Sequence, residues 1–458
     1  MIAILKLLAP VLLYLAAVII LFVSFSGRVR YGLWFLVPLL PLQNVMNKFQ
    51  AFPMGKDLND ILLLAMLAGW FLSSMSEKRP VFLKSSLNGL LFFFLVYTYF
   101  SLWLGSLNLH LPPPIDIHDL SVQRWKNYMI FPLLYFLISN NLRDKADLKK
   151  LFWAMCAAMF LMNYYNVQQV SDLTSWVNRT KLEGTFVDLG ANETAAFYAT
   201  YPFVLMGVFL FVKSWKWRVP LAILIAADSF VNLFCYSRGA YMATLAGLVV
   251  FSVLKQKKLI IPIILVLALW QSVLPQSVIE RLIFTEEAGQ LDVSAARRLE
   301  LWEQAVIYFQ QNPIFGVGFD AFHQLGHGDT HSIFMKTLSE QGVVGMLILI
   351  AIWGVSIKKG WQLYRKAQDG FLKGLGFGFF VCVFAVMTGN LFGDRWTHLP
   401  LGAFFWVYLG MVERGIVLSA ESAPAPVKGV TEKNSGSKRE YVNPRLVNPY
   451  IKNFKKRK

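Results

Sequence analysis

FLKGLGFGFFVCVFAVMTGNLF, residues Phe371–Phe392, shows which kind of fold this chain adopts. The stretch contains one charged residue, Lys373, and is close to the ~20 helical residues that cross the hydrocarbon layer of a bilayer. A strand of a membrane barrel would instead alternate apolar and polar residues. An open sheet would leave backbone groups unpaired in lipid. The stretch therefore predicts a transmembrane helix.

Similar apolar runs recur along the chain, which has 458 residues, 56% of them hydrophobic. We expect an all-α polytopic membrane protein with about 12–13 transmembrane helices in residues 1–418. The predicted spans are Ile2–Phe25, Tyr31–Leu42, Leu58–Met75, Leu87–Gly105, Tyr128–Ile138, Leu148–Val170, Ala191–Val212, Val219–Cys235, Gly239–Leu254, Leu259–Leu274, Ser332–Ile357, Phe371–Phe392 and Leu399–Leu418. Residues 419–458 carry too little apolar content to fold alone and predict a disordered basic tail.

The formal net charge of +17 is explained by membrane topology and needs no nucleic-acid partner. Its cations lie in short clusters between the apolar spans, and every second connector is richer in Lys and Arg than its neighbours. The positive-inside rule places the richer connectors and the tail in the cytoplasm, where the tail can contact anionic membrane lipids. The alternate connectors are then external.

The largest external connector is a polar loop over residues 275–331, in which arginines, histidines, acids and glycines are dense. Within it, Ala296–Gln311 is predicted to be an amphipathic helix. Arg298 lies one turn before Trp302, at a level where a guanidinium group can bind a phosphate through two hydrogen bonds. The alternative is that Arg298 pairs with Glu300 or Glu303.

Three further polar residues occupy external positions next to apolar spans. Arg238 in YSRGAY lies between two apolar spans, and a charge so close to the membrane is costly. Either Arg238 has a functional role, or its side chain extends to the membrane interface. Asn192 in GTFVDLGANETAAF is suited to cap a helix or to hydrogen-bond a sugar. Arg395 in DRWTH belongs to the last external loop and is expected at the rim of the same site.

His331 begins the span HSIFMKTLSEQGVVG, and an imidazole in this position can act as a base near neutral pH. With His323 and His327 it forms an H-x3-H-x3-H series, a spacing that would place three rings on one face of a continuous helix. Gly326 and Gly328 interrupt that helix, and no acid or cysteine completes a ligand set. We therefore predict no metal site.

Two acids lie inside predicted spans, where a charged group needs a partner. Glu340 is expected to pair with Lys336, one helical turn earlier. Asp228 precedes Arg238 by ten residues and is expected to line the same cavity. No phosphate-binding loop or dinucleotide fingerprint occurs in a suitable context, so no cofactor is predicted.

Four motifs in order resemble the O-antigen ligase and O-antigen polymerase superfamily. They are SRG at Ser237–Gly239, R-x3-W at Arg298–Trp302, NPIFGVGFDAF at Asn312–Phe322 and H-S-x8-Q-G-x2-G at His331–Gly345. The upstream segment GTFVDLGANETAAF is also similar to the family. The resemblance covers roughly residues 184–392, and the earlier spans only by hydropathy.

This resemblance implies a glycosyltransferase of the bacterial inner membrane that works on the periplasmic face without metal. The donor would be a glycan on undecaprenyl diphosphate, and the acceptor a saccharide, lipid A core or protein. Arg238 and Arg298 would bind the diphosphate, and His331 would activate the acceptor, so that His331 and Arg298 are the expected catalytic residues. Asn192, Trp302 and Arg395 are the other expected substrate-binding residues. The family resemblance, and no residue of this chain, favours polymerisation over ligation.

A transporter or flippase of a lipid-linked oligosaccharide is the alternative from another class. It would show duplicated halves and several charges deep in its spans. The chain has no 20–50-residue repeat, and its polar residues concentrate on one side. A non-catalytic scaffold would tolerate loss of Arg238, Arg298 or His331.

Overall fold

The computed structural model describes residues 2–173, 176–182, 184–187, 189–284, 286–287, 290–291 and 293–421. The predicted tail lies outside the described residues from position 422 onward. Its first three residues continue the last helix, which ends at Glu421.

The described chain is almost entirely helical. Its first half contains α1 (Ile2–Phe25), α2 (Val29–Leu39), α3 (Gln43–Met46), η1 (Asn47–Ala51), α4 (Leu58–Ser76), α5 (Ser86–Asn108), α6 (Leu120–Asn141), α7 (Lys145–Ser171), η2 (Trp176–Lys181), α8 (Ala191–Thr200), α9 (Pro202–Phe211) and α10 (Trp215–Phe234). The second half contains α11 (Arg238–Leu254), η3 (Lys257–Leu259), α12 (Ile260–Ala268), α13 (Trp270–Val273), α14 (Gln276–Ile283), β1 (Glu286–Glu287), β2 (Gln290–Leu291), α15 (Val293–Gln311), α16 (Ala321–Gln324), α17 (Ile333–Lys366), α18 (Gly370–Gly389) and α19 (Leu399–Glu421). The strands β1 and β2 form one short antiparallel pair.

The predicted all-α polytopic membrane fold is confirmed. Within the described ranges, eight helical segments are long and apolar enough to cross a membrane, and α2 and α11 are shorter apolar helices. The span predicted at Tyr128–Ile138 lies inside the longer α6, whereas the continuous span predicted at Leu259–Leu274 is wrong, because this stretch is divided among η3, α12 and α13. Hydropathy measures apolar content and not helical continuity. The count of 12–13 crossings stays a prediction.

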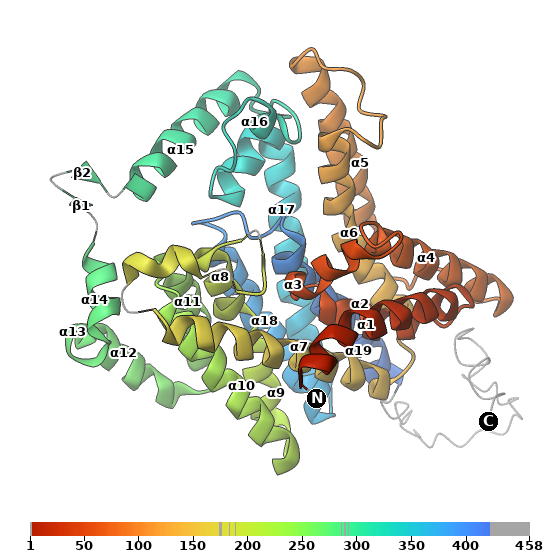
Figure 1. Ribbon diagram of the computed structural model, residues 1–458, viewed down its shortest axis with the longest axis horizontal. Helices are drawn as coiled ribbons and strands as arrows, with labels where there is room; N and C mark the ends of the chain where they lie inside the picture. Colours follow the sequence, from red (N-terminus) through yellow and green to blue (C-terminus); the bar gives the residue numbers. More distant parts are fainter. Residues whose placement is uncertain are drawn as a thin grey trace, which may run out of the picture.

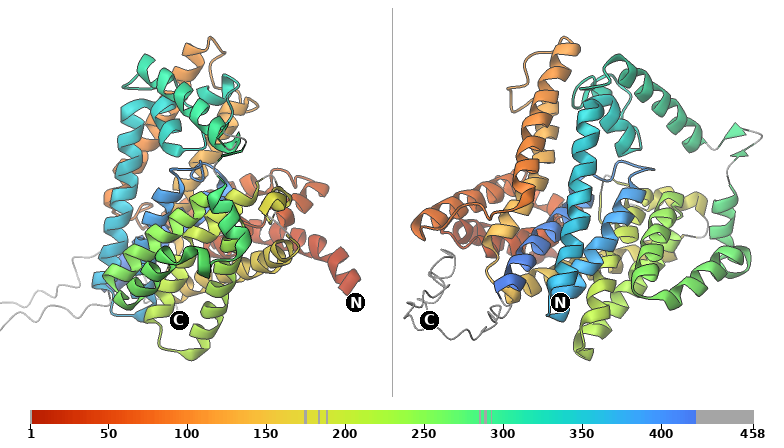
Figure 2. Two further views of the ribbon diagram at one scale, coloured as in Figure 1. Left: turned by 90° about the vertical axis from the view of Figure 1, so that its left-hand side faces the viewer. Right: turned by 180° about the vertical axis from the view of Figure 1, so that it is seen from behind.

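The helices form three groups around a buried centre (Figure 1). Helices α1, α2 and α4 lie on one side, α8 to α11 lie on the other, and α17, α18 and α19 lie between them. The tip of α5 and the helices α15 and α16 extend beyond the rest at the end where α17 begins (Figure 2). The part of the large loop that contains α15 and α16 therefore lies over one end of the bundle, whereas α14 lies beside the group of α8 to α11.

Helices α18 and α9 pack so closely that their backbones are in contact. A Cβ at Gly374 would lie 2.6 Å from the carbonyl oxygen of Gly207, and one at Gly378 would lie 2.6 Å from that of Phe203. Small residues at four-residue spacing allow helices to approach this closely, and the gain in packing drives association where no hydrophobic effect operates between helices. The approach fixes α8 and α9 relative to the loop that follows α18.

Helix α17 is broken at Gly342, which has a φ of 62° and a ψ of −161°. The break leaves two helical carbonyls without their usual partners, and the NPIFGVGFDAF segment supplies new ones. The amides of Val317 and Gly318 donate to the carbonyls of Ser339 and Glu340 at 2.9 Å each. In return, residues just after the break donate to residues 313 and 314. Two of the motifs recognised in the sequence are thus the two halves of one structural joint.

The same joint fastens α5. The amide of Phe319 donates to the carbonyl of Ser101 at 3.0 Å, and Asn108 donates through its side-chain amide to the carbonyl of Val317 at 2.9 Å. The hydroxyl of Tyr97 donates to the carbonyl of Gln341 at 2.5 Å. The polar loop is therefore held in one place relative to the membrane-spanning helices.

We predict that Gly342→Ala lowers the free energy of unfolding by more than about 2 kcal/mol. The added Cβ would lie 2.4 Å from the carbonyl oxygen of Ile314, and alanine is strained at a positive φ. Gly354→Ala, on the same helix with open space around the new methyl group, should be neutral or stabilising by up to about 1 kcal/mol. Thermal unfolding in detergent compares the two, and equal melting temperatures would contradict the proposed joint.

Candidate functional site

A cavity beside the polar loop is lined by five arginines. Its lining residues are Arg179, Asn192, Ala196, Ser237, Arg238, Gly239, Ala240, Arg281, Arg298, Gly389, Phe392 and Arg395. Among these described lining residues there is no Asp or Glu. Guanidinium groups are permanently charged and form paired hydrogen bonds to phosphate or carboxylate oxygens. The cavity is therefore built to attract an anion.

The five arginines come from five separate elements. Arg179 lies in η2, Arg281 in α14 and Arg298 in α15. Arg238 is the first residue of α11, and Arg395 lies in the loop between α18 and α19. Because these positions span more than two hundred residues of sequence, only the folded bundle brings them together.

Polar contacts orient the side chains on one wall of the cavity. Arg179 donates to the carbonyl oxygen of Tyr236 at 3.0 Å and to the side-chain oxygen of Asn192 at 3.3 Å. Arg238 donates to the carbonyl oxygen of Phe284 at 3.0 Å. Tyr236 has a φ of 53°, a left-handed conformation that is costly for a tyrosine and often occurs near functional sites. This turn presents Arg238 to the cavity.

The other wall carries two more anchored guanidinium groups. Arg395 forms an ion pair with Glu193 at 2.9 Å, and Glu193 also accepts the amide of Gly190 at 3.2 Å. Arg281 is buried and lies over the ring of Trp176, 5.2 Å from its centroid. A cation held over an indole face is stabilised by the quadrupole of the ring. These contacts keep the arginines at the cavity despite their mutual repulsion.

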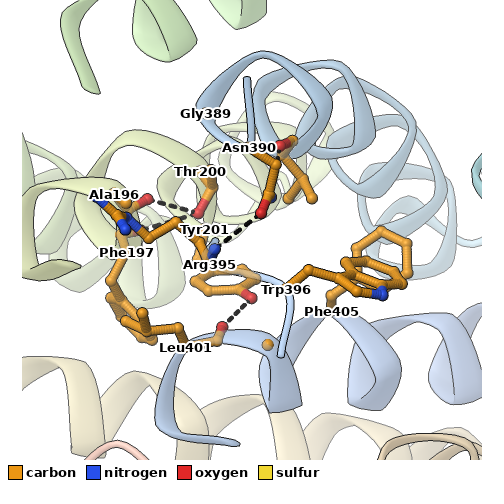
Figure 3. Close-up of a pocket in the computed structure, with 12 residues that line it drawn as sticks. Ala196, Phe197, Thr200, Tyr201, Gly389, Asn390, Arg395, Trp396, Leu401 and Phe405 are labelled. Atoms are coloured by element: carbon orange, nitrogen blue, oxygen red, sulfur yellow. Dashed lines mark hydrogen bonds between the residues drawn. The ribbon is translucent and has the colours of Figure 1, made fainter. Parts of the chain in front are cut away.

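The free space of the cavity is about 20 Å³ in this conformation, room for roughly one water molecule. A second space of about the same size adjoins it, lined mainly by aromatic and aliphatic side chains (Figure 3). The two share Ala196, Gly389 and Arg395. In the second space, Thr200 donates to the carbonyl of Ala196 and Tyr201 to that of Leu401, so their hydroxyl protons are already used. A larger anion must displace side chains to enter.

The predicted site residues divide into two groups. Arg238, Arg298, Arg395 and Asn192 all line the arginine cavity. His331 and Trp302 are absent from its described lining. The structure therefore brings four of the six predicted residues together.

Trp302 has another contact that ties it to the predicted histidine. Its indole N–H donates to the carbonyl of Thr330 at 3.0 Å, directly before His331 in the chain. Trp302 therefore connects the helix of Arg298 to the segment of His331. Its role as a substrate-binding residue stays a prediction.

His331 lies in a strained turn just before α17. Its φ is 53°, its amide donates to the Asp329 carboxylate at 3.0 Å, and its side chain is 43% exposed. The Nδ1 atom lies 3.6 Å from Oδ2 of Asp329.

The three-histidine series does not form one helical face. The short α16 ends at Gln324, after His323, and Nε2 of His327 lies 2.9 Å from the hydroxyl of Tyr308. Within the part of the chain that the structure describes, no three His, Cys, Asp or Glu side chains are grouped to hold a metal ion.

Lys336 is paired with Asp394, and not with Glu340 as the helical spacing suggested. Its ammonium nitrogen lies 2.9 Å from Oδ2 of Asp394, whose side chain is 1% exposed. The loop after α18 brings this acid to α17, so a tertiary contact replaces the expected contact between adjacent turns. The pKa of Asp394 is held well below its usual range, because Lys336, His398 and a hydrogen bond from Thr397 outweigh the effect of burial.

Asp228 is also placed differently from the prediction. It is fully buried in α10, accepts a hydrogen bond of 2.7 Å from the side chain of Asn163, and is absent from the lining of the arginine cavity. The side chain lies in the contact of α10 with α7, where it bonds Asn163.

The sequence was compared with known protein families. Residues 221–350 match the family described as O-antigen ligase. This part of the chain is similar to that family. The predicted family resemblance is thus confirmed. No curated protein sequence matches the chain.

The residues that match the family contain only part of the arginine cavity. Arg238, Arg281 and Arg298 lie inside the matched residues, whereas Arg179 and Arg395 lie outside them. Sequence reasoning missed Arg179 and Arg281, which it counted only as charges of external connectors. The sequence feature that could have revealed them is the presence of arginines in connectors that are otherwise poor in cations.

We predict that Lys336→Met makes the stability of the protein depend on pH. In the wild-type protein the pKa of Asp394 is lower in the folded state than in the unfolded chain, where it is ~3.9. The ionised carboxylate therefore stabilises the fold at every pH above ~3.9. This contribution is lost as the pH falls through the folded-state pKa. Without Lys336, burial should raise the pKa of Asp394 above the unfolded value. The variant should then lose stability as the pH rises from about 5 to about 8.

The control is Lys336→Met with Asp394→Asn, which retains His398 and every other group that faces Asp394 but has no carboxylate to titrate. Melting temperatures measured across the same pH range should fall for the single variant and stay level relative to wild type for the double variant. Parallel curves for both variants would contradict this assignment.

Proposed function

We propose that the protein is a glycosyltransferase that moves a glycan from an undecaprenyl-diphosphate carrier to a saccharide acceptor at the periplasmic face of the bacterial inner membrane. The observation that carries the proposal is the arginine cavity, which joins three arginines from the residues that match the O-antigen ligase family to two arginines from outside them. A membrane-attached diphosphate is an anion that matches both the charge of the cavity and its place in a helical membrane bundle.

Binding of the donor would begin with the diphosphate. Arg238 and Arg298 are proposed to contact its oxygens, and Arg395 lies on the wall shared with the aromatic space. Because the cavity has room for about one water molecule, the guanidinium groups must move apart or turn toward the phosphates as the donor enters. The anion then replaces their mutual repulsion with attraction.

The proposed reaction is a single displacement at the anomeric carbon. An acceptor hydroxyl oxygen forms a bond to that carbon, and the bond from the carbon to the diphosphate oxygen breaks, so that undecaprenyl diphosphate leaves with the electron pair. The configuration of the carbon inverts. Charge develops on the leaving phosphate, where fixed guanidinium groups stabilise it most in a site that excludes water. No metal ion is required in this scheme.

The proton of the acceptor hydroxyl is proposed to pass to Nε2 of His331. The imidazole is half exposed and lies outside the cavity lining, so an acceptor can reach it from the external side. Asp329, 3.6 Å from Nδ1, would stabilise the imidazolium that forms. The donor and the base are thus proposed to lie on two sides of the anomeric carbon.

We predict that Arg298→Ala and His331→Ala each lower transfer by at least about a hundredfold, as removal of a group that stabilises a transition state typically does. The matched control is Arg297→Ala, one residue away. Arg297 is half exposed and pairs with Glu300 at 2.7 Å. Product formed from a lipid-linked oligosaccharide in proteoliposomes measures the effect. Wild-type rates in both purified variants would remove these assignments.

The acceptor is distinguished by the size of the product. We propose a growing surface polysaccharide, which predicts a ladder of products from one lipid-linked donor, whereas ligation to lipid A core or protein predicts a single transfer. Incubation of the wild-type protein with each acceptor in turn, followed by electrophoresis, separates the two. A single band with every acceptor would contradict polymerisation without contradicting transfer.

A further inference from the structure

The loop between α18 and α19 is fastened to the start of α17 at two points. The amide of Ile333 donates to the carbonyl of Asn390 at 3.2 Å, and the side chain of Lys336 pairs with Asp394 at 2.9 Å. Ile333 and Lys336 lie two and five residues after His331. The segment of the proposed base and the loop of a cavity arginine are therefore joined directly.

Asp394 also organises its own loop. Its Oδ1 accepts the amides of Trp396 at 3.2 Å and Thr397 at 3.0 Å, and its Oδ2 accepts the hydroxyl of Thr397 and the ammonium group of Lys336. Both carboxylate oxygens are thus fully used by this turn and by α17. Nothing in the geometry leaves the Asp394 carboxylate available to bind a substrate.

Arg395 stands inside this bonded turn. Its amide donates to the side-chain oxygen of Asn390 at 2.9 Å, and its chain neighbours on both sides belong to the Asp394 network. With the backbone fixed at these points, its guanidinium group pairs with Glu193 and lines the cavity. Figure 3 shows Arg395 beside Asn390. The direction of the Arg395 side chain therefore depends on the turn that Asp394 maintains.

A buried ion pair is a poor source of net stability, because the cost of removing two charges from water nearly cancels their attraction. Such pairs are better explained where they fix one geometry among several. We propose that Lys336 and Asp394 are positioning residues, whose ion pair holds Arg395 at the cavity in register with the segment of His331. The catalytic consequence rests on the proposed function, whereas the structural consequence does not.

The structural consequence is tested by hydrogen exchange of purified protein in detergent. Lys336→Met should speed exchange in the peptide that contains residues 390–398, whose amides lose a fixed acceptor, by at least about tenfold. Lys336→Arg, which keeps the charge, should restore protection. Unchanged exchange in Lys336→Met would overturn the proposal whatever the activity of the protein.

A matched control lies at the opposite end of α18. Lys145 pairs with Asp369 at 2.7 Å, and Asp369 likewise accepts two backbone amides, those of Phe371 and Leu372. Lys145→Met should therefore perturb a similar pair while exchange at residues 390–398 stays as in the wild type. Faster exchange there in the control would show a general loss of structure.

The catalytic consequence is tested by a double-mutant cycle on donor KM. If Lys336 acts through Arg395, Lys336→Met should raise KM about tenfold, Arg395→Ala should raise it at least as much, and the combination should raise it no further than Arg395→Ala alone. Multiplicative effects would overturn the positioning role. If no variant and no wild-type sample transfers glycan, the proposed function fails, and the hydrogen-exchange result still decides the structural claim.

Discussion

The repulsion among five guanidinium groups at one cavity is the constraint on which the rest of the structure depends. Like charges repel strongly where water is scarce, so a protein can collect them only by anchoring each one. Backbone carbonyls hold Arg179 and Arg238, an indole ring covers Arg281, and a carboxylate pairs with Arg395. The anchors belong to different elements. The helical bundle is therefore the frame that keeps an anion-binding site assembled.

Two sets of contacts hold the segments that carry the cavity arginines. The break of α17 at Gly342 receives the NPIFGVGFDAF segment and so fixes the polar loop that carries Arg298. The Lys336–Asp394 pair ties the beginning of the same helix to the loop of Arg395. Helix α17 thus holds the loop of Arg395 and the segment that leads from α15, and the predicted base precedes its first residue. Motifs that are separate in the sequence therefore contact one another in the fold and together hold Arg298 and Arg395.

Much of this arrangement follows from local sequence, and the remainder does not. Apolar length predicts the spanning helices, and the family resemblance predicts that Arg238 and Arg298 meet at one site. Apolar content cannot reveal that residues 259–274 are broken into short helices, because hydropathy carries no information on backbone continuity. Helical spacing suggested that Lys336 pairs with Glu340, yet a distant loop provides the partner. Arg179 and Arg281 were missed because convergence of distant elements leaves no local pattern.

The most direct test of the central claim is an electron cryomicroscopy map of the protein in lipid nanodiscs with undecaprenyl diphosphate. The account predicts density for two phosphates in the arginine cavity, within hydrogen-bond distance of the guanidinium groups of Arg238 and Arg298. It also predicts that His331 faces the side of the diphosphate from which an acceptor arrives. Phosphate density at another place in the bundle, with the cavity arginines uncontacted, would contradict the account.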